Sequence, residues 1–252
     1  HWRAEQATMD VTTTDPKWVE PDSLNILERA FFPLMKDKRD LIFIRTAAEM
    51  TVVLFPLATL MFLLPPWGVA LSVLPYIGFV FLSYGGRFGL MLHAVGHRPI
   101  FKRKYRFIQN YIPFALGPFM GHTPTSFAAH HMWMHHAENN MLADHSCTLP
   151  YKRDSFFHFL HYFARFFVMG HIHLARYLAL RGRWKHVRRF FAGELLWVVL
   201  AVLAWQINWA AALAVFIVPM IMMRWLMMAG NFAQHAFVDI DDPDNGYKNS
   251  NN

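Results

Sequence analysis

The chain has 252 residues, of which 55% are hydrophobic, including 24 Phe, 15 Met and 9 Trp. One soluble core of this length does not need so many apolar side chains, so the composition favours a membrane protein. The 24 Lys and Arg residues exceed the 17 Asp and Glu residues, but they lie between apolar runs without interleaved aromatics, which excludes nucleic acid as the expected partner and favours anionic lipid headgroups.

The polar segment 1–40 lacks the apolar core of a cleaved signal peptide, so we expect it to remain as a cytoplasmic N-terminal segment. Beyond it lie four apolar runs long enough to cross a bilayer, whose hydrocarbon core takes about 20 helical residues. Short turns, "PPWG" and "QIN", separate the first run from the second and the third from the fourth, which predicts two helical hairpins. The runs are Leu41 to Leu64, Val69 to Leu92, Phe190 to Trp205 (at most to Asn208) and Trp209 to Met228.

Lys and Arg flank these runs on one side only. The stretches "KDKR", "HRPIFKRKYR" and "RGRWKHVRR" lie before the first run, after the second and before the third, whereas neither hairpin turn contains Lys or Arg. By the positive-inside rule, both termini and the section 98–189 belong to the cytoplasmic face. In that section, 111–121 is expected to be a short interfacial piece and 156–182 an amphipathic helix among the headgroups.

These patterns predict the fold class. We expect one domain over residues 1–252, an all-α integral membrane protein that crosses the membrane several times. Its four transmembrane helices form two hairpins, and a cytoplasmic helical cap carries the histidines described below. A single cysteine, Cys147, excludes an intrachain disulfide framework.

Charged residues inside the runs need partners, because an unpaired charge is costly in a bilayer. Arg45 and Glu49 lie four residues apart on one helix face and are expected to pair. Arg224 lies near the cytoplasmic end of its run, so we expect its guanidinium to extend to the headgroups. All three residues are expected to be structural.

The 15 histidines gather on the predicted cytoplasmic side and avoid the middle of every apolar run. One pair of helical histidines is as often structural as functional. Three segments, however, present side chains with the same i, i+4 spacing at one membrane depth, which favours a metal site. They are "HAVGH" with His93 and His97, "HMWMHH" with His131, His135 and the adjacent His136, and "NFAQH" with Asn231 and His235.

The type of ligand limits the metal. Neutral imidazole suits Zn, Cu, Fe and Ni. Structural zinc usually stops at four ligands, often with Cys, and a zinc protease motif needs Glu where Ala94 stands. Paired haem ligands would face each other inside a bundle rather than lie at its rim. A histidine-rich site for two redox-active metal ions beside a lipid-accessible cavity fits best.

This pattern resembles that of the membrane-bound di-iron fatty-acid desaturases and hydroxylases, a superfamily that includes the alkane monooxygenases. The resemblance extends from about Leu41 to Asp242. It implies two non-haem iron ions and dioxygen as a co-substrate. The metal ligands that it implies are His93, His97, His131, His135, His136 and His235, with Asn231 as a direct or water-mediated ligand.

Two features of the superfamily do not occur in the printed sequence. The pattern ends in another HxxHH box, which we expect in a continuation of the chain beyond Asn252; the alternative is a loss of activity. There is no HPGG motif of a fused cytochrome b5, so the resemblance implies a separate electron donor of the ferredoxin or cytochrome b5 type. The basic stretches 98–106 and 181–189 would suit such an acidic carrier, and lipid headgroups equally well.

The activity that the resemblance implies is oxidation of an unactivated C–H bond of a fatty-acyl chain by dioxygen at the cytoplasmic face. The stretch "NFAQHAF" favours desaturation, whereas the HxxxHH spacing resembles alkane hydroxylases equally well. Hydroxylation of a fatty acid or alkane is therefore the alternative, followed by a catalytically inactive membrane subunit or metal-binding protein. We expect a membrane lipid or acyl substrate in a closed apolar tunnel that ends at the metal-facing ends of the second and fourth runs. The oligomeric state is not predicted.

Further side chains around the boxes are expected to have supporting roles. On an α-helix, His130 would point about 100° away from His131 and would support the ligands rather than bind metal. Glu138 and Asp144 are candidates to orient ligating rings through the second ring nitrogen. The other histidines of the cap are expected to lie at the headgroup level. They are His122, His145, His158, His161, His171, His173 and His186, and the pair of most interest is His171 and His173.

Overall fold

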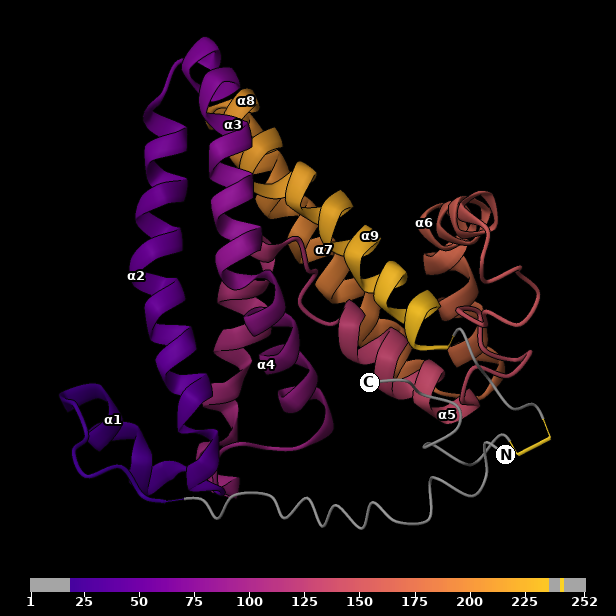
Figure 1. Ribbon diagram of the computed structural model, residues 1–252, viewed down its shortest axis with the longest axis horizontal. Helices are drawn as coiled ribbons and strands as arrows, with labels where there is room; N and C mark the ends of the chain where they lie inside the picture. Colours follow the sequence, from indigo (N-terminus) through magenta and orange to yellow (C-terminus); the bar gives the residue numbers. More distant parts are fainter. Residues whose placement is uncertain (1–18, 236–240, 243–252) are drawn as a thin grey trace, which may run out of the picture.

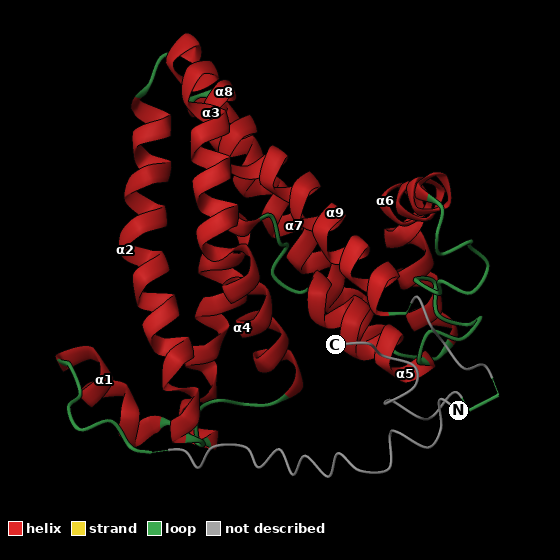
Figure 2. Ribbon diagram, in the orientation of Figure 1, coloured by secondary structure: helices red, strands yellow, loops and turns green. Residues whose placement is uncertain are grey.

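The computed structural model describes residues 19–235 and 241–242, and within these ranges the chain forms helices and no strand (Figure 2). Predictions that concern 1–18, 236–240 and 243–252 lie outside the described residues. Four helices of the described part are long and apolar enough to cross a membrane, which confirms the predicted all-α fold with four spans. The spans are α2 (Leu41–Leu63), α3 (Pro66–Val80) continued through η4 (Phe81–Gly85) into α4 (Gly86–His97), α7 (Trp184–Ile207), and α8 (Trp209–Ala212) continued through η9 (Leu213–Ile217) into α9 (Val218–Gln234).

The second and fourth helices are longer than the apolar runs that predicted them. The second continues past Leu92 to His97, and the fourth continues past Met228 to Gln234. Each contains a π-helical stretch, η4 in the middle of the second helix and η9 near the start of the fourth. The candidate ligands of the first and third segments therefore lie on the ends of the spans themselves, in rigid helix or directly beside it.

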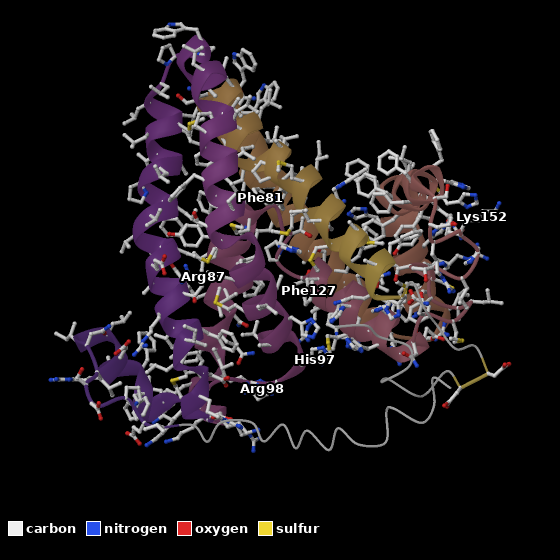
Figure 3. All side chains as sticks on the ribbon, in the orientation of Figure 1. Phe81, Arg87, His97, Arg98, Phe127 and Lys152 are labelled. Atoms are coloured by element: carbon white, nitrogen blue, oxygen red, sulfur yellow. The ribbon has the colours of Figure 1, made fainter. Side chains whose placement is uncertain are left out.

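The two hairpin turns meet at one end of the bundle. The side chain of Asn208, between α7 and α8, donates hydrogen bonds to the carbonyls of Phe62 (3.3 Å) and Leu64 (2.9 Å), at the end of α2. The same side chain caps α8 by accepting from the N–H of Ala211 at 3.1 Å. Figure 1 shows both turns at the top of the molecule and the two hairpins diverging towards the opposite end. Nitrogen- and oxygen-bearing side chains gather at that opposite end (Figure 3).

The N-terminal segment is tied to the end of α4. It contains α1 (Ile26–Phe31), η2 (Phe32–Leu34) and η3 (Lys38–Asp40), and an isolated β-bridge joins Met35 to Phe101. The buried carboxylate of Asp40 accepts two hydrogen bonds from the guanidinium of Arg98, the residue that follows His97. This ion pair fixes the exit of the chain from the first histidine box.

The charges inside the spans pair differently from our expectation. Arg45 bonds to Glu28 of α1, and Glu49 bonds to Arg87 of α4, so the expected Arg45–Glu49 pair is wrong. Helix packing offers each of them a partner on another element, which an intrahelical spacing argument does not consider. The expectation for Arg224 is also wrong, because its side chain is only 17% exposed and lies 3.7 Å from Glu194 of α7.

The section between the hairpins covers one end of the bundle. It comprises η5 (Arg103–Asn110), η6 (Ile112–Leu116), η7 (Gly117–Met120), η8 (Ala128–His135), α5 (His136–Glu138) and the long α6 (Phe156–Leu180). Figure 1 shows α6 almost end-on, so its axis crosses those of the spans. This direction is the one expected of a helix that lies along a membrane surface.

Gly121 allows this section to approach the fourth span. It has a φ of 76°, and a Cβ at this position would lie 2.1 Å from the carbonyl oxygen of Pro219 in α9. Both the left-handed backbone and the contact with a rigid backbone atom therefore require glycine.

The topology is testable by labelling. In a variant with Cys147 replaced by Ser, single cysteines at Lys36 and Lys185 should react with a membrane-impermeant maleimide from the same face, since both lie at the end away from the hairpin turns. A cysteine at Trp67, in the first turn and 71% exposed, should react from the other face. If the cysteines at positions 36 and 185 reacted from opposite faces, the two-hairpin topology would be wrong.

Gly121→Ala should destabilise the protein by roughly 2–5 kcal/mol, because it combines backbone strain with an overlap that α9 cannot relieve. Thermal unfolding of the detergent-solubilised protein measures the effect. Gly78→Ala is the matched control, since a Cβ there meets nothing within 4 Å and Ala favours the helix. Equal unfolding midpoints for the two variants would refute this account of Gly121.

Candidate metal centre

Four histidines from three elements form a compact group, which we term the four-histidine cluster. His93 and His97 come from α4, His131 from η8 and His136 from α5. One ring nitrogen of each lies within 4.8 Å of those of the other three. The rings lie at the end of the bundle away from the hairpin turns, where Figure 3 shows His97 below Phe127. The sequence thus correctly placed the first two boxes beside each other.

The helical geometry explains the two halves of this cluster. On α4 the i, i+4 spacing stacks the rings of His93 and His97 with centroids 4.4 Å apart, as expected. The second box instead lies on a π-helix, in which the N–H of His136 bonds to the carbonyl of His131, five residues earlier. The Nε2 atoms of these two residues are 3.0 Å apart. The expected i, i+4 pairing of His131 with His135 is therefore replaced by an i, i+5 pairing of His131 with His136.

His135 and His235 form a second group beside the cluster, the His135–His235 pair. Their Nε2 atoms are 3.3 Å apart. The ring of His135 lies with its centroid 5.8 Å from that of His131 and 5.7 Å from that of His136. Three segments far apart in the sequence thus bring six imidazoles into two adjacent groups.

Asp144 orients one of these rings, as the sequence suggested. Its carboxylate lies 2.6 Å from Nδ1 of His135, so Nδ1 carries the proton and Nε2 keeps its lone pair for a metal ion. Ser146 donates to the same carboxylate through its N–H (2.8 Å) and its hydroxyl (2.6 Å). Glu138 has a different role from the one considered, because it accepts hydrogen bonds from Tyr177 and Arg181.

The distances between the ring nitrogens are close to those expected of imidazole ligands on a shared metal ion. With imidazole–metal bonds of about 2.1 Å, two ligands at right angles lie about 3.0 Å apart and two tetrahedral ligands about 3.4 Å apart. The Nε2 separations of 3.0 Å in the His131–His136 pair and 3.3 Å in the His135–His235 pair match this range. The 4.8 Å spread of the four-histidine cluster is slightly wider than the about 4.2 Å between opposite ligands. Imidazole is also a suitable donor for iron.

The rings of His131 and His136 can bind a cation because they stay neutral. Burial and the neighbouring His136 lower the pKa of His131 to about 2, and burial together with His135 lowers that of His136 to about 4. Burial alone would raise the pKa of Asp144, but the hydrogen bonds from His135 and Ser146 lower it below its usual range. At neutral pH the rings of His131 and His136 are therefore uncharged, and Asp144 is ionised.

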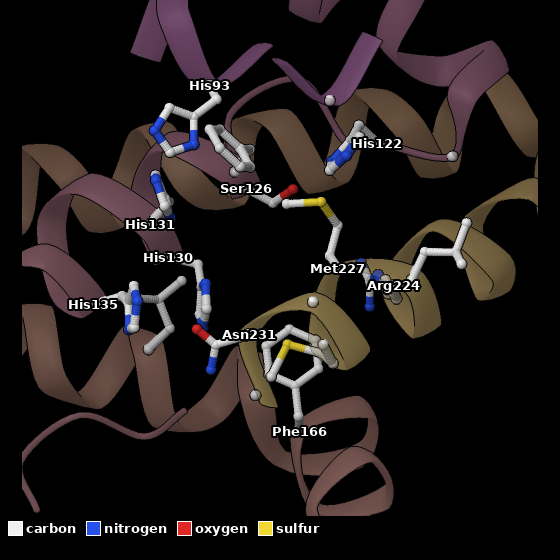
Figure 4. A pocket seen from close by; sticks show the side chains of 18 of the residues that line it. His93, His122, Ser126, His130, His131, His135, Phe166, Arg224, Met227 and Asn231 are labelled. Carbon is white, nitrogen blue, oxygen red and sulfur yellow. The ribbon is translucent and has the colours of Figure 1, made fainter. Parts of the chain in front are cut away.

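Asn231 lies beside these groups and is anchored by its amide nitrogen, which donates to the hydroxyl of Tyr162 (2.6 Å) and the carbonyl of Ser146 (3.1 Å). Its carbonyl oxygen is the atom that remains for a metal ion or a bridging water. Asn231 lines the same cavity as His131 and His135 (Figure 4). Its role as a ligand stays a prediction.

A cavity of about 280 Å³ adjoins the histidines. The second and fourth spans line it, as predicted, with Gly89 and Leu90 on one side and Met227 and Met228 on the other. Leu90 and Leu226 belong to its lining and are themselves exposed, so the cavity opens laterally between these two spans. It is not the wholly apolar tunnel that we expected, because several polar side chains also line it, among them His122, His171 and Arg224.

These polar residues are the part of the site that the sequence did not indicate. His122 and His171 were assigned to the headgroup level, yet His122 is buried and both line the cavity. Burial lowers the pKa of His122 to about 3. His130 lies outside the four-histidine cluster, as expected, with its ring parallel to that of His135. One feature of the sequence could have indicated the polar residues. Glu194 and Arg224 are ionisable residues inside apolar runs, where such residues need a partner or serve a function.

The fold and the site define a helical membrane protein with a polyhistidine cluster that could hold metal, next to a cavity between the second and fourth spans. The family model described as fatty acid desaturase matches residues 65–252, which include all seven candidate ligands. The chain belongs to the fatty acid desaturase family. Neither a curated protein nor a solved structure matches the chain.

Asp144→Asn should weaken metal binding by roughly tenfold to a hundredfold, because the ring of His135 loses its anionic acceptor. Competition with a chelator, read out as metal retained per chain, measures this. Glu138→Gln is the control, since Glu138 binds Tyr177 and Arg181 rather than a ring. An equal loss of metal in the two variants would show that Asp144 has no specific role.

Proposed function

We propose that the protein catalyses O2-dependent oxidation of an unactivated C–H bond of a fatty-acyl chain, with desaturation as the outcome. The observation that carries this proposal is the convergence of six histidines, in two adjacent groups, beside a cavity that three of them line. Membership of the fatty acid desaturase family supports it independently. The reaction class, the metal and the substrate all belong to the proposal.

In this proposal each group of histidines has one role. The four-histidine cluster would hold one iron and the His135–His235 pair, with Asn231, the other. Two bound irons would supply the reduction of dioxygen and the removal of hydrogen from the substrate. Asp144 keeps the ring of His135 in the tautomer that binds metal.

Aromatic rings shield the histidines on the cavity side. The ring of Phe127 stacks on that of His131 with centroids 4.7 Å apart, and Phe166 meets the edge of His130 at 5.2 Å. Both aromatic residues line the cavity. They exclude water from the space between the substrate and the metal centre, which limits side reactions there.

The lateral opening indicates how a lipid chain would enter. Leu90 and Leu226 flank the opening from the second and fourth spans, and Met227 and Met228 follow inside. An acyl chain can move from the bilayer into such a space without crossing water, and Met side chains adapt to its shape. Each buried CH₂ contributes roughly 0.8 kcal/mol to its binding relative to water.

Desaturation and hydroxylation share the same first hydrogen removal, so the product decides between them. The "NFAQH" segment favours desaturation, and the HxxxHH spacing of the second box supports hydroxylation as the second candidate. Substrate placement differing by less than 1 Å is enough to change the outcome. A catalytically inactive subunit is the remaining alternative, and metal content distinguishes it from an enzyme.

Electrons would come from a separate carrier of the ferredoxin or cytochrome b5 type. We propose that it docks at the predicted cytoplasmic face, on the exposed basic stretch that follows the first box. Lys102, Arg103, Lys104 and Arg106 are all exposed there. Complementary charge would steer an acidic carrier to this end of the bundle, which also holds the histidines.

Expression of the natural full-length protein in a host that lacks the activity, followed by lipid profiling, tests the proposal. New double bonds should appear in host acyl chains, with about two irons per purified chain. His131→Ala should reduce the product below detection, whereas His161→Ala, on the exposed side of α6, should not change it. A folded protein without iron and without product would favour the inactive subunit, and hydroxylated lipids would favour the hydroxylase.

A further inference from the structure

The cavity has two chemically different walls. His93, His131 and His135 lie on one side of it, and Arg224 and His122 on the other (Figure 4). His171 of α6 completes the second side, which we term the polar wall and define as Arg224, His122 and His171. A purely hydrocarbon substrate gives the polar wall nothing to bind.

A carboxylate behind the polar wall determines which donors remain available. Glu194 of α7 accepts hydrogen bonds from the hydroxyl of Thr123 and from Nε2 of His171, the latter at 2.9 Å. Since Nε2 of a neutral His171 then carries the proton, it has no lone pair for Arg224, although the two groups approach to 3.3 Å. Arg224 itself lies 3.7 Å from Glu194, which is an ion pair but too long for a hydrogen bond.

Arg224 therefore has donors to spare. Within the described residues, its guanidinium contacts His171, Glu194 and the ring of Phe167, whose centroid is 5.9 Å away. A guanidinium carries five N–H donors, and leaving them unsatisfied in a buried site is costly. With a side chain only 17% exposed, Arg224 has little water to satisfy them.

His122 is an independent observation that points to the same group. It is 8% exposed, lines the cavity, and its Nε2 has no hydrogen-bond partner among the described residues. Two side chains from different elements thus face one space with unfilled hydrogen-bonding capacity. The complementary group is an oxygen atom that accepts hydrogen bonds.

The charge balance decides between a charged and a neutral oxygen. The charges of Arg224 and Glu194 cancel, so an added carboxylate would leave an uncompensated negative charge in a mostly apolar bundle. Burying such a charge is unfavourable, whereas a carbonyl or hydroxyl oxygen accepts from Arg224 without changing the balance. A neutral oxygen is therefore favoured.

We propose that the polar wall binds a neutral carbonyl or hydroxyl oxygen of the substrate inside the helix bundle. This inference rests on the proposed function in one respect, since it takes the cavity as the substrate site of the metal centre. His93, His131 and His135 line the same cavity, so an oxygen held at the polar wall would keep the attached chain beside the histidines of the proposed metal centre.

Binding without turnover tests the inference. Purified full-length protein in detergent is kept under argon, and equilibrium dialysis measures the Kd of labelled methyl dodecanoate, tetradecane and dodecanoate. The quantity of interest is the ratio of the Kd of tetradecane to that of methyl dodecanoate, because partition into micelles is the same for every variant. The double substitution Arg224→Met with Glu194→Gln removes both charges together and leaves no buried charge unpaired.

The double variant should lower this ratio by about tenfold or more, the effect of losing a hydrogen bond to a charged donor. Arg224→Lys, which keeps the charge but changes the donor geometry, should give an intermediate ratio and keeps the test informative if the double variant does not fold. Met222→Leu, on the same helix but outside the cavity, should leave the ratio unchanged.

Two results would overturn the inference. One is a ratio that is the same in the wild type, the double variant and Arg224→Lys. The other is dodecanoate binding more tightly than the ester in an Arg224-dependent way, which would make the polar wall an anion site. If the ratio behaves as expected but host lipids remain unchanged, the proposed function fails and the oxygen site stands.

Discussion

Mutual repulsion among imidazolium rings is the constraint on which this site depends. Ring nitrogens 3.0 to 4.8 Å apart cannot all be protonated, so the cluster is stable only while its rings stay neutral or share a cation. Burial of His131 and the ionised Asp144 act in this direction, since one lowers the pKa of a ring and the other fixes a tautomer. A divalent metal removes the repulsion altogether, so holding one stabilises the surrounding helices.

A change of helical register assembles the rings. The π-helix of η8 turns its residues so that His131 and His136 meet, while His130 lies parallel to His135. A regular α-helix would place His135 under His131 and leave His136 to one side. One stretch of π-helix thus divides neighbouring histidines between the four-histidine cluster and the His135–His235 pair.

The sequence predicted what depends on hydrophobic length and local spacing. Four spans, two hairpins and the His93–His97 pair follow from these alone, and Asp144 was identified as a candidate from its place near the second box. Contacts between distant elements were not predictable in this way. The partners of Arg45, Glu49 and Arg224 come from other helices, the i, i+5 register of η8 depends on its packing, and the polar wall combines three segments that no spacing rule connects.

The ion pair between Asp40 and Arg98 joins the region that the family model matches to the segment before it. The matched region begins at residue 65, yet the chain that leaves the first box is held by two residues upstream of it: Asp40, which pairs with Arg98, and Met35, which bridges to Phe101. The stretch that the family model matches therefore depends on contacts with residues upstream of it. A change before residue 65 can displace the first histidine box without touching a candidate ligand.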